Sequence, residues 1–494
     1  MKPLPLLFLL LAPVIAPAQF TYVTNSNNTI TITGYTNSDT TLIVPDTIAG
    51  LPVTIIGDEA FNGDSNLQSI TLPPSVLNIA HAAFNNCSAL AAVTMSDGLT
   101  NIASGVFNFC SSLTNLVFPD SVTTLGGQVF FGCSGLTNIL LGSRLNTLAQ
   151  DTFFDCSGLL AINVSSNNPV YSSTGGVLFS KDQTSLVVYP GGASSSYTIP
   201  DGVTTIGLDA FASSTVSNVV VSDGVTTIKD DAFFDCTNLM TAEISGSLTN
   251  FGTGIFEECT ALGSVTISNG VTGIGDAMFA ICQSLTNVNL PDSLTTIGDS
   301  AFFECSSLAN IVIPEGVTNI GEAAFSSCAG LAQVTLPSSL VNIGEEAFSG
   351  CSALASIVIP QSVTSFGLEA FGNCSNLTTV YFEGAPPAGT STFSPDNIIA
   401  YYLPGTPGWG ATYEGFPTAL FPNPAILNFG IQANAFGFTI SGATNVPVIV
   451  DATTDLSDPD WLPIQTNILT AGTAFFSDPQ SASYSMRFYR LRSP

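Results

Sequence analysis

Residues 285–305 read LTNVNLPDSLTTIGDSAFFEC, and residues 308–328 repeat this text as LANIVIPEGVTNIGEAAFSSC. The shared pattern is L-x-x-V-x-L-P-x-x-V-x-x-I-G-x-x-A-F-x-x-C, and it returns every 23 residues. Self-similarity at a fixed period of roughly 20 to 50 residues is the signature of a solenoid. The pattern therefore predicts one coil of backbone that is repeated and stacked over most of the chain.

Thirteen phenylalanines mark the coils, and in eleven of them a cysteine follows three residues later. Stacking would place each strand roughly 4.8 Å from its copy in the next coil, as a parallel sheet. No coil can bury its apolar side alone, so stability is expected to come from neighbouring coils. The marker residues are Phe61, Phe84, Phe107, Phe130, Phe153, Phe211, Phe233, Phe256, Phe279, Phe302, Phe325, Phe348 and Phe371.

Local signals divide each coil into short pieces. The alternating L-x-x-V-x-L segment indicates a strand, and the proline after it ends that strand. The glycine after V-x-x-I is expected to allow a tight turn, and x-x-A-F-x-x-C is expected to form one helical or 3₁₀ turn. We therefore predict an α/β solenoid, a parallel strand ladder plus short helical or 3₁₀ turns, with a small all-β C-terminal domain.

The coils of the form LP(D/E)xVTxIGxxAFxxC, as in residues 290–305, resemble the BspA-like leucine-rich repeats of many secreted and surface proteins of bacteria and some protozoa. The resemblance covers roughly residues 20–420, and it includes GVLFS at 176–180 and YTIP at 197–200. It implies a leucine-rich repeat solenoid, horseshoe-shaped or gently curved, with roles in adhesion or binding to proteins and other surfaces. It implies no catalysis, and no ligand residue carries over.

The sequence at both ends departs from the repeat. Residues 1–18 combine Lys2, an apolar stretch and the small residues Ala16 and Ala18 around Pro17, which predicts a secretory signal peptide and an exported protein. Pro422 and Pro424 mark the start of a C-terminal module. We predict a capping hairpin at 19–50, repeats at 51–385 with a hairpin insertion at about 165–200, a closing cap at 386–421 and a β-sandwich-like module at 422–494.

Charge and composition exclude several classes of function. The chain has 36 acidic and 7 basic residues, a net charge of −29, which argues against nucleic acid as a partner. After the leader, no apolar stretch is long enough to span a membrane. The single histidine, His81, occupies an ordinary repeat position with no nucleophile motif near it. We therefore predict no catalytic residue, no cofactor and no metal.

Three patterns each leave two interpretations open. Eleven cysteines in a secreted protein favour disulfides, yet the repeat position favours a reduced, buried ladder. The acidic rows, such as Asp276, Asp299 and Glu322, indicate either a calcium or basic-partner site or a solvated edge. Three arginines near the C-terminus indicate either a sorting or docking signal or one face of a final strand; they are Arg487, Arg490 and Arg492.

Recognition is expected on outward positions of the first strand of each coil and on the insertion. These positions are small, polar and uncharged, without the Tyr, Trp and Arg anchors of typical hot spots. The residues are Thr286, Asn287, Asn289, Asn310, Gln333 and Thr335 on the strands, with Tyr171, Lys181 and Tyr189 on the insertion. We predict an exported, monomeric, non-enzymatic protein that binds an extracellular protein or glycan. The alternative is a structural spacer of the cell envelope, attached through the C-terminal module.

Overall fold

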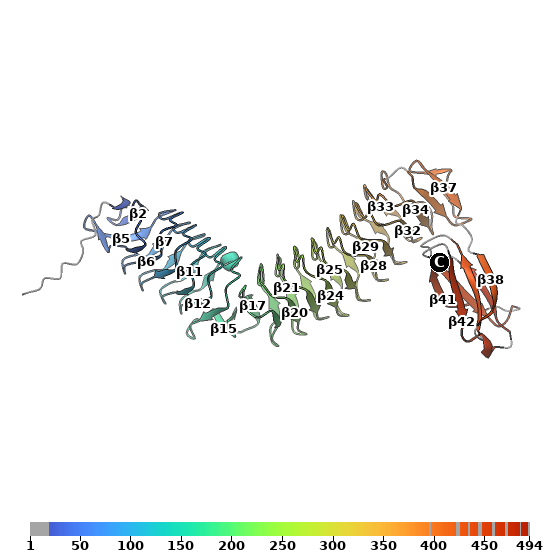
Figure 1. The fold of residues 1–494 in the computed structure, drawn as a ribbon, viewed down its shortest axis with the longest axis horizontal. Coiled ribbons are helices and arrows are strands. Elements are labelled where there is room, and N and C mark those ends of the chain that lie inside the picture. Colours follow the sequence, from blue (N-terminus) through green and yellow to red (C-terminus); the bar gives the residue numbers. More distant parts are fainter. Residues whose placement is uncertain are drawn as a thin grey trace, which may run out of the picture. The chain divides into compact units, whose positions relative to one another are not determined.

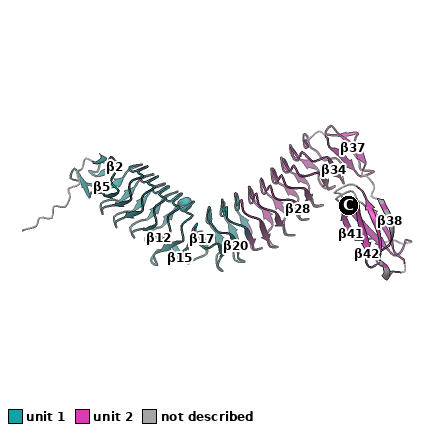
Figure 2. Ribbon diagram, viewed as in Figure 1, with its two compact units in different colours: residues 1–241, 250–259 teal, residues 242–249, 260–494 magenta. Residues whose placement is uncertain are grey.

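A computed structural model describes residues 19–492, apart from 395–396, 421–424, 433–434, 443–446, 457–459, 470–472 and 485. The chain divides into two compact units, residues 1–241 with 250–259 and residues 242–249 with 260–494 (Figure 2). The predicted signal peptide and the two prolines at 422 and 424 lie outside the described residues. Each unit is described by itself below.

The first unit begins with an antiparallel hairpin of β1 (Phe20–Thr24) and β2 (Ile30–Tyr35), and β2 pairs in parallel with β5 (Leu51–Ile56). Two ladders of short parallel strands then run along the stack. The first strands of the coils are β3 (Thr41–Ile43), β6 (Ser69–Thr71), β8 (Ala92–Thr94), β10 (Asn115–Val117), β12 (Asn138–Leu141) and β14 (Ala161–Val164). The second strands are β7 (Asn78–Ile79), β9 (Asn101–Ile102), β11 (Thr124–Leu125) and β13 (Thr147–Leu148), and β4 (Thr47–Ile48) pairs with β5.

The insertion joins this stack instead of protruding from it. β15 (Tyr171–Thr174), β16 (Val177–Ser180) and β17 (Ser185–Val188) pair antiparallel, with Phe179 opposite Leu186. β17 then pairs in parallel with β19 (Thr205–Ile206), so the hairpin supplies a rung of the second ladder. The unit continues with β18 (Ser196–Thr198), β20 (Asn218–Val221), β21 (Thr227–Ile228) and β23 (Asn250–Phe251).

The second unit has the most regular coils (Figure 1). The first strands of its coils are β24 (Ser264–Ile267), β26 (Asn287–Asn289), β28 (Asn310–Val312), β30 (Gln333–Thr335), β32 (Ser356–Ile359), β34 (Thr379–Phe382), β35 (Ile399–Tyr402) and β37 (Phe416–Leu420), and β22 (Thr241–Ile244) precedes them. At the edge, β36 (Thr412–Tyr413) pairs antiparallel with β37. The second ladder contains β25 (Gly273–Ile274), β27 (Thr296–Ile297), β29 (Asn319–Ile320), β31 (Asn342–Ile343) and β33 (Ser365–Phe366). The predicted solenoid of stacked parallel strands is confirmed.

Phenylalanine and cysteine fill the core of each coil. The rings of Phe302 and Phe325 stack with centroids 5.1 Å apart and planes 5° apart, and Phe348 continues the row at 5.2 Å and 3°. The thiol of Cys328 donates a hydrogen bond to the carbonyl of Phe302, 3.1 Å away. All eleven cysteines are buried and none of them is in a disulfide, so in this structure the cysteine ladder is reduced.

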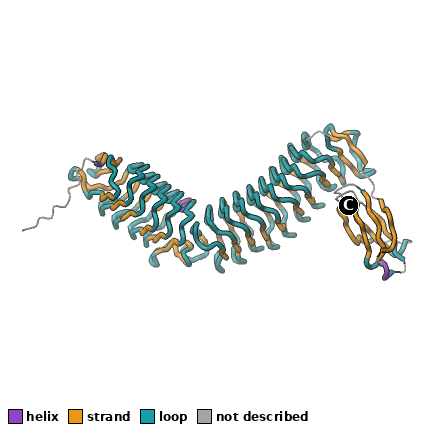
Figure 3. Tube along the Cα trace, in the orientation of Figure 1, coloured by secondary structure: helices purple, strands orange, loops and turns teal. Residues whose placement is uncertain are grey.

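The prediction of helical or 3₁₀ turns was wrong. Turns replace them in nearly every coil (Figure 3), and the described solenoid has one short 3₁₀ helix, η2 (Gln150–Phe153). The cause is backbone conformation two residues before and two residues after the phenylalanine. Around Phe325, both Ala323 (φ 51°) and Ser327 (φ 62°) are left-handed. L-residues adopt that conformation singly and not as a helix, so the segment cannot continue as one.

The role predicted for the glycine after V-x-x-I was also wrong. Gly321 is outside the left-handed region, so its turn does not require glycine for its φ angle. A Cβ atom there would instead lie 2.5 Å from the carbonyl carbon of Gly298 in the preceding coil. The glycine therefore permits close approach of two backbones, which is the second reason that proteins use this residue.

The C-terminal module consists of two three-stranded antiparallel sheets, β38-β39-β42 and β41-β40-β43. Their bounds are β38 (Ala425–Gln432), β39 (Ala435–Ser441), β42 (Thr473–Asp478), β41 (Leu462–Ile468), β40 (Pro447–Thr453) and β43 (Phe488–Arg492), with a short 3₁₀ helix η3 (Ser481–Ser483). Phe438, Ile440, Val448, Val450 and Phe476 pack in one core. An all-β module is therefore present, and the domain boundaries given above stay predictions.

Candidate functional site

The first-strand ladder of the second unit presents one row of side chains inward and one row outward. In β28, Ile311 is buried while Asn310 and Val312 on either side are exposed. In β30 the outward residues are Gln333 and Thr335, and they lie opposite Asn310 and Val312 in the parallel register. The period of two along a strand thus builds a continuous outward surface from equivalent residues of successive coils.

We call this surface the strand face and define it by the outward residues of β26, β28 and β30. All six predicted strand residues, Thr286, Asn287, Asn289, Asn310, Gln333 and Thr335, are exposed. Amides and hydroxyls alternate there with Val312, which is 64% exposed. The amides and hydroxyls can donate hydrogen bonds to a flat ligand and accept them from it. Apart from them the surface has a single apolar residue, and it has no charge that would steer a ligand.

The character of the outward surface changes at β32. The positions equivalent to Thr335 become Val358, Tyr381 and Tyr401 in the parallel register. Tyr381 is only 4% exposed and stacks on Tyr401 with centroids 5.2 Å apart. Sequence reasoning did not identify this apolar end of the ladder, although the change from Thr and Asn to Val and Tyr at one coil position would have indicated it.

The insertion does not present all three of its predicted binding residues. Lys181 is exposed, and its Nζ donates to the carbonyl of Ser166 at 3.1 Å. Tyr171 is half-buried, whereas Tyr189 is 3% exposed and donates its hydroxyl hydrogen to Ser194. Burial raises the pKa of Tyr189 to about 12. Tyr189 is therefore a core residue, because its ring takes the place of the coil phenylalanine and stacks on Phe211 at 4.6 Å.

The acidic rows cap the backbone of neighbouring coils. Oδ1 of Asp276 accepts the backbone N–H of Asp299 at 2.9 Å, and Oδ1 of Asp299 accepts that of Glu322 at 2.8 Å. In the other row, the backbone N–H of Ser143 donates to Asp120 and lowers the pKa of that carboxyl. Over residues 19–492, gaps excepted, no group of three or more His, Cys, Asp and Glu is arranged to hold a metal. The rows thus have a structural use in the part of the chain described.

Cys133, Cys328 and His81 show none of the features of a nucleophilic site. Burial raises the pKa of Cys133 and of Cys328 to about 12, so neither thiol ionises near neutral pH. His81 is exposed, and its backbone N–H donates to Asp58 at 3.1 Å as in the other coils. Its position is therefore that of an ordinary repeat residue.

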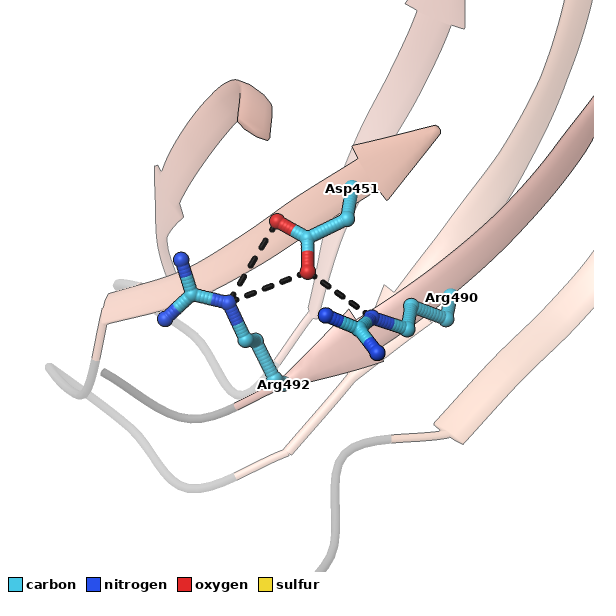
Figure 4. A network of polar contacts seen from close by, with 3 residues as sticks. All are labelled: Asp451, Arg490 and Arg492. Atoms are coloured by element: carbon cyan, nitrogen blue, oxygen red, sulfur yellow. Dashed lines mark hydrogen bonds and ion pairs between the residues drawn. The ribbon is translucent and has the colours of Figure 1, made fainter. Parts of the chain in front are cut away.

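All three C-terminal arginines form ion pairs within the module, and Figure 4 shows those of Arg490 and Arg492 with Asp451. Asp451 is 1% exposed, and its carboxylate accepts from Nε of Arg490 at 2.9 Å and from Nε of Arg492 at 3.0 Å. Arg487 pairs with Asp478 at 3.0 Å. These contacts fix the final strand to its neighbours and leave Arg490 and Arg492 a little under half exposed.

Comparison with protein families and solved structures gives a consistent assignment. The family described as BspA type leucine rich repeat region matches residues 52–174, 191–309 and 272–400, in 6 copies. Curated protein sequences give no match. In the part of the chain that the structure describes, no helix has the length and hydropathy needed to span a membrane.

Several solved structures are similar. A leucine-rich repeat protein from Eubacterium ventriosum is 25% identical, with 72% of this chain and 93% of that chain covered and a TM-score of 0.55. A leucine-rich repeat protein from Bacteroides ovatus is 22% identical over 78% of this chain and 98% of its own, with a TM-score of 0.47. A leucine rich cell surface protein from Faecalibacterium prausnitzii is 22% identical over 74% of this chain and 94% of its own, with a TM-score of 0.40.

Proposed function

Because this chain belongs to the BspA-type leucine-rich repeat family, we propose that it is an exported binding or adhesion protein that contacts an extracellular protein or glycan through its solenoid. Proteins with such repeats are typically non-enzymatic binding scaffolds of bacterial cell surfaces. Beyond this statement about the family, we propose for this chain a class of ligand, the surface that binds it and export from the cell.

The observation that carries the proposal is the exposure of the strand face. In a parallel ladder the same outward position recurs in every coil, so Asn310 and Gln333 lie side by side in register. A ligand with its own repeat, such as a glycan chain or an extended protein segment, can make the same weak contact several times. Many weak contacts in series give useful avidity without strong hot spots.

The strand face is an uncharged surface on an acidic protein. Its outward residues carry no charge, while the chain as a whole has a net charge of −29. Uncharged amides and hydroxyls remain able to bind at high ionic strength, since salt screens interactions between charges and not hydrogen bonds. We therefore expect the contacts that these uncharged residues make to be nearly independent of salt concentration.

The proposal is tested with a glycan and extracellular-protein array, screened with the mature chain, residues 19–494, beside a chain ending at residue 421. A saturable hit that both chains share supports recognition by the solenoid. A hit that needs residues 422–494 transfers recognition to the C-terminal module or to the surface that the module shares with the solenoid. Absence of any hit from the folded protein, together with its recovery in washed envelopes, supports the envelope spacer.

A further inference from the structure

A cavity of about 270 Å³ lies where the strand face meets the C-terminal module, within the second unit. Residues of β30 and β32 form one side of it, among them Thr335 and Val358. Pro447, at the start of β40, and Ile468, at the end of β41, line it from the module. The outward row of the ladder therefore continues from an open surface into a partly open cavity.

Two carboxylates and an apolar surface line this cavity. Glu315 and Glu383 both line it, together with Val358, Pro447 and Ile468. Among the described residues of the lining, none is basic and none is aromatic. The cavity thus offers negative charge and aliphatic contact to whatever enters, and no positive charge to balance the two carboxylates.

The two carboxylates differ in how they are held. Oε2 of Glu315 accepts the backbone N–H of Ser338 at 3.0 Å and its hydroxyl at 2.7 Å, so that side chain is fixed in place. Glu383 is half-buried, and none of the ion pairs found among the described residues includes it. Burial raises the pKa of the Glu383 carboxyl. A nearby cation would offset this loss of hydration, because an opposite charge favours the ionised form.

We propose that this cavity binds one lysine or arginine side chain of a protein partner, an inference that rests on the binding function proposed above. The aliphatic stem would lie against Val358 and Ile468, and the cationic head would reach Glu383 and Glu315. Long cationic side chains are suited to such sites, since their stems bury against apolar surface while their heads keep polar contacts. Charge-assisted hydrogen bonds to carboxylates are stronger than neutral ones.

Size and composition favour a side chain over a glycan. Pockets for drug-sized ligands have volumes of roughly 300–1,000 Å³, and this cavity is slightly smaller. Aromatic rings are the large, flat contact surfaces most useful to a ring-shaped ligand, yet the aromatic side chain nearest along the ladder, Tyr381, is buried against Tyr401. A neutral glycan would also leave the two carboxylates without a counter-charge.

The test uses the mature chain and three heptapeptides of glycine and serine, with a central lysine, arginine or norleucine. Norleucine keeps the aliphatic stem and removes the charge. Titration calorimetry is expected to show saturable binding of the lysine and arginine peptides, with the norleucine peptide at least about tenfold weaker. Equal binding of all three peptides, or binding of none of them, overturns the proposal.

Variants then place the binding in the cavity. Glu383→Gln keeps the shape of the side chain and removes its charge, and it is expected to lower the affinity for the lysine peptide about tenfold. The matched control is Asp292→Asn, because Asp292 occupies the coil position of Glu315 and does not line this cavity. A second variant, Ile468→Lys, supplies a cation from the module and is expected to abolish peptide binding without loss of fold. Unchanged binding in both Glu383→Gln and Ile468→Lys overturns the proposal.

Acidity gives an independent readout. Glu315 and Glu383 are the titratable groups in the described lining. Because burial raises the pKa of the Glu383 carboxyl, acidification from neutral pH is expected to remove its charge and to lower the affinity for the lysine peptide. If the array identifies a ligand while the lysine peptides do not bind, the proposed function stands and this inference fails. A pH-independent affinity also contradicts it.

Discussion

The regular coils of the second unit and the interrupted coil of the first unit build the same core from different sequences. In the regular coils, Phe325 stacks between its copies and its N–H donates to Ala347 at 2.7 Å. In the interrupted coil, Tyr189 occupies the ring position and its N–H donates to Ala210 at the same distance. The ring and the hydrogen-bond register therefore define a coil, and neither the length of 23 residues nor the consensus text is required.

The two regions differ in how they place carboxylates. In the regular coils, Asp276 and Asp299 each accept a backbone N–H of the next coil. Beside the interrupted coil, Asp209 is half-buried, and burial together with Asp231, Asp151 and Asp230 raises its pKa to about 6. Next to the break in the repeat, carboxylates are therefore crowded around Asp209.

Removing one ring from a regular coil should have the largest effect. Phe325→Ala deletes a fully buried ring between two stacked neighbours and is expected to cost about 3–5 kcal/mol of unfolding free energy. Urea unfolding followed by far-ultraviolet circular dichroism measures it. The control is Phe303→Ala, whose ring is only half-buried. An equal cost for both variants would show that the inner ring row has no special part in stability.

The second-largest effect is expected where the glycine of one coil lies close to the backbone of the preceding coil, and it should differ between the two regions. Gly321→Ala places a Cβ atom 2.5 Å from a backbone carbon, and we expect destabilisation of about 1–3 kcal/mol. Gly207 holds the same coil position after the insertion, where the nearest atom would be 3.0 Å away. Gly207→Ala should therefore cost less in the same urea experiment. The comparison fails if Gly207→Ala is the more damaging change.

The crowded aspartate predicts a pH dependence of stability at Asp209, beside the interrupted coil. A raised pKa means that the folded state holds its proton more tightly, so Asp209 favours folding below about pH 4 and this contribution is lost as pH rises through 6. We expect Asp209→Asn to reduce the change in unfolding free energy between low and neutral pH by about 1 kcal/mol. This value is smaller than the full pKa shift would give, because the side chain is partly solvated. Thermal melts from pH 4 to 7 measure it, with Asp299→Asn as control. A pH profile unchanged by Asp209→Asn would contradict the account.

The smallest effect concerns the left-handed residues of the turns. Ala323 has a φ of 51°, and Gly254 already occupies the same position of another coil with a φ of 63°. Ala323→Gly is expected to stabilise by about 0.5 kcal/mol, because the relief of strain exceeds the added chain entropy. Asp151 holds this position beside the insertion with a φ of −83°, so Asp151→Gly should not stabilise. Thermal midpoints of the two variants decide the matter.

The sequence determined most of the solenoid because each coil repeats the same evidence. The period of 23 residues and the alternation within L-x-x-V-x-L predicted the parallel ladders, and both are present. The turns were mispredicted because Ala-Phe with flanking polar residues also suits a helix, and left-handed φ angles at Ala323 and Ser327 leave no clear sign in residue type. Gly321 was misread because its constraint comes from another coil.

The candidate site was only partly accessible from sequence. Alternation placed Asn310 and Gln333 outward, because the residue after each of them turns inward: Ile311 is buried and Val334 is half-buried. The same alternation could not predict that Lys181 lies on the surface and Tyr189 in the core, because both residues are in an aperiodic segment. The cavity at Glu383 was out of reach, because two distant segments of the chain form it.

The most direct test of the account is the affinity of two double variants for the ligand that the array identifies. Asn310→Arg with Gln333→Arg places bulky side chains on the strand face, and Thr296→Arg with Asn319→Arg does the same on the second ladder, where these residues are also exposed and in register. The account predicts that the first pair weakens binding at least tenfold and that the second leaves it unchanged. Equal affinity of both variants, or loss only in the second, would contradict recognition by the strand face.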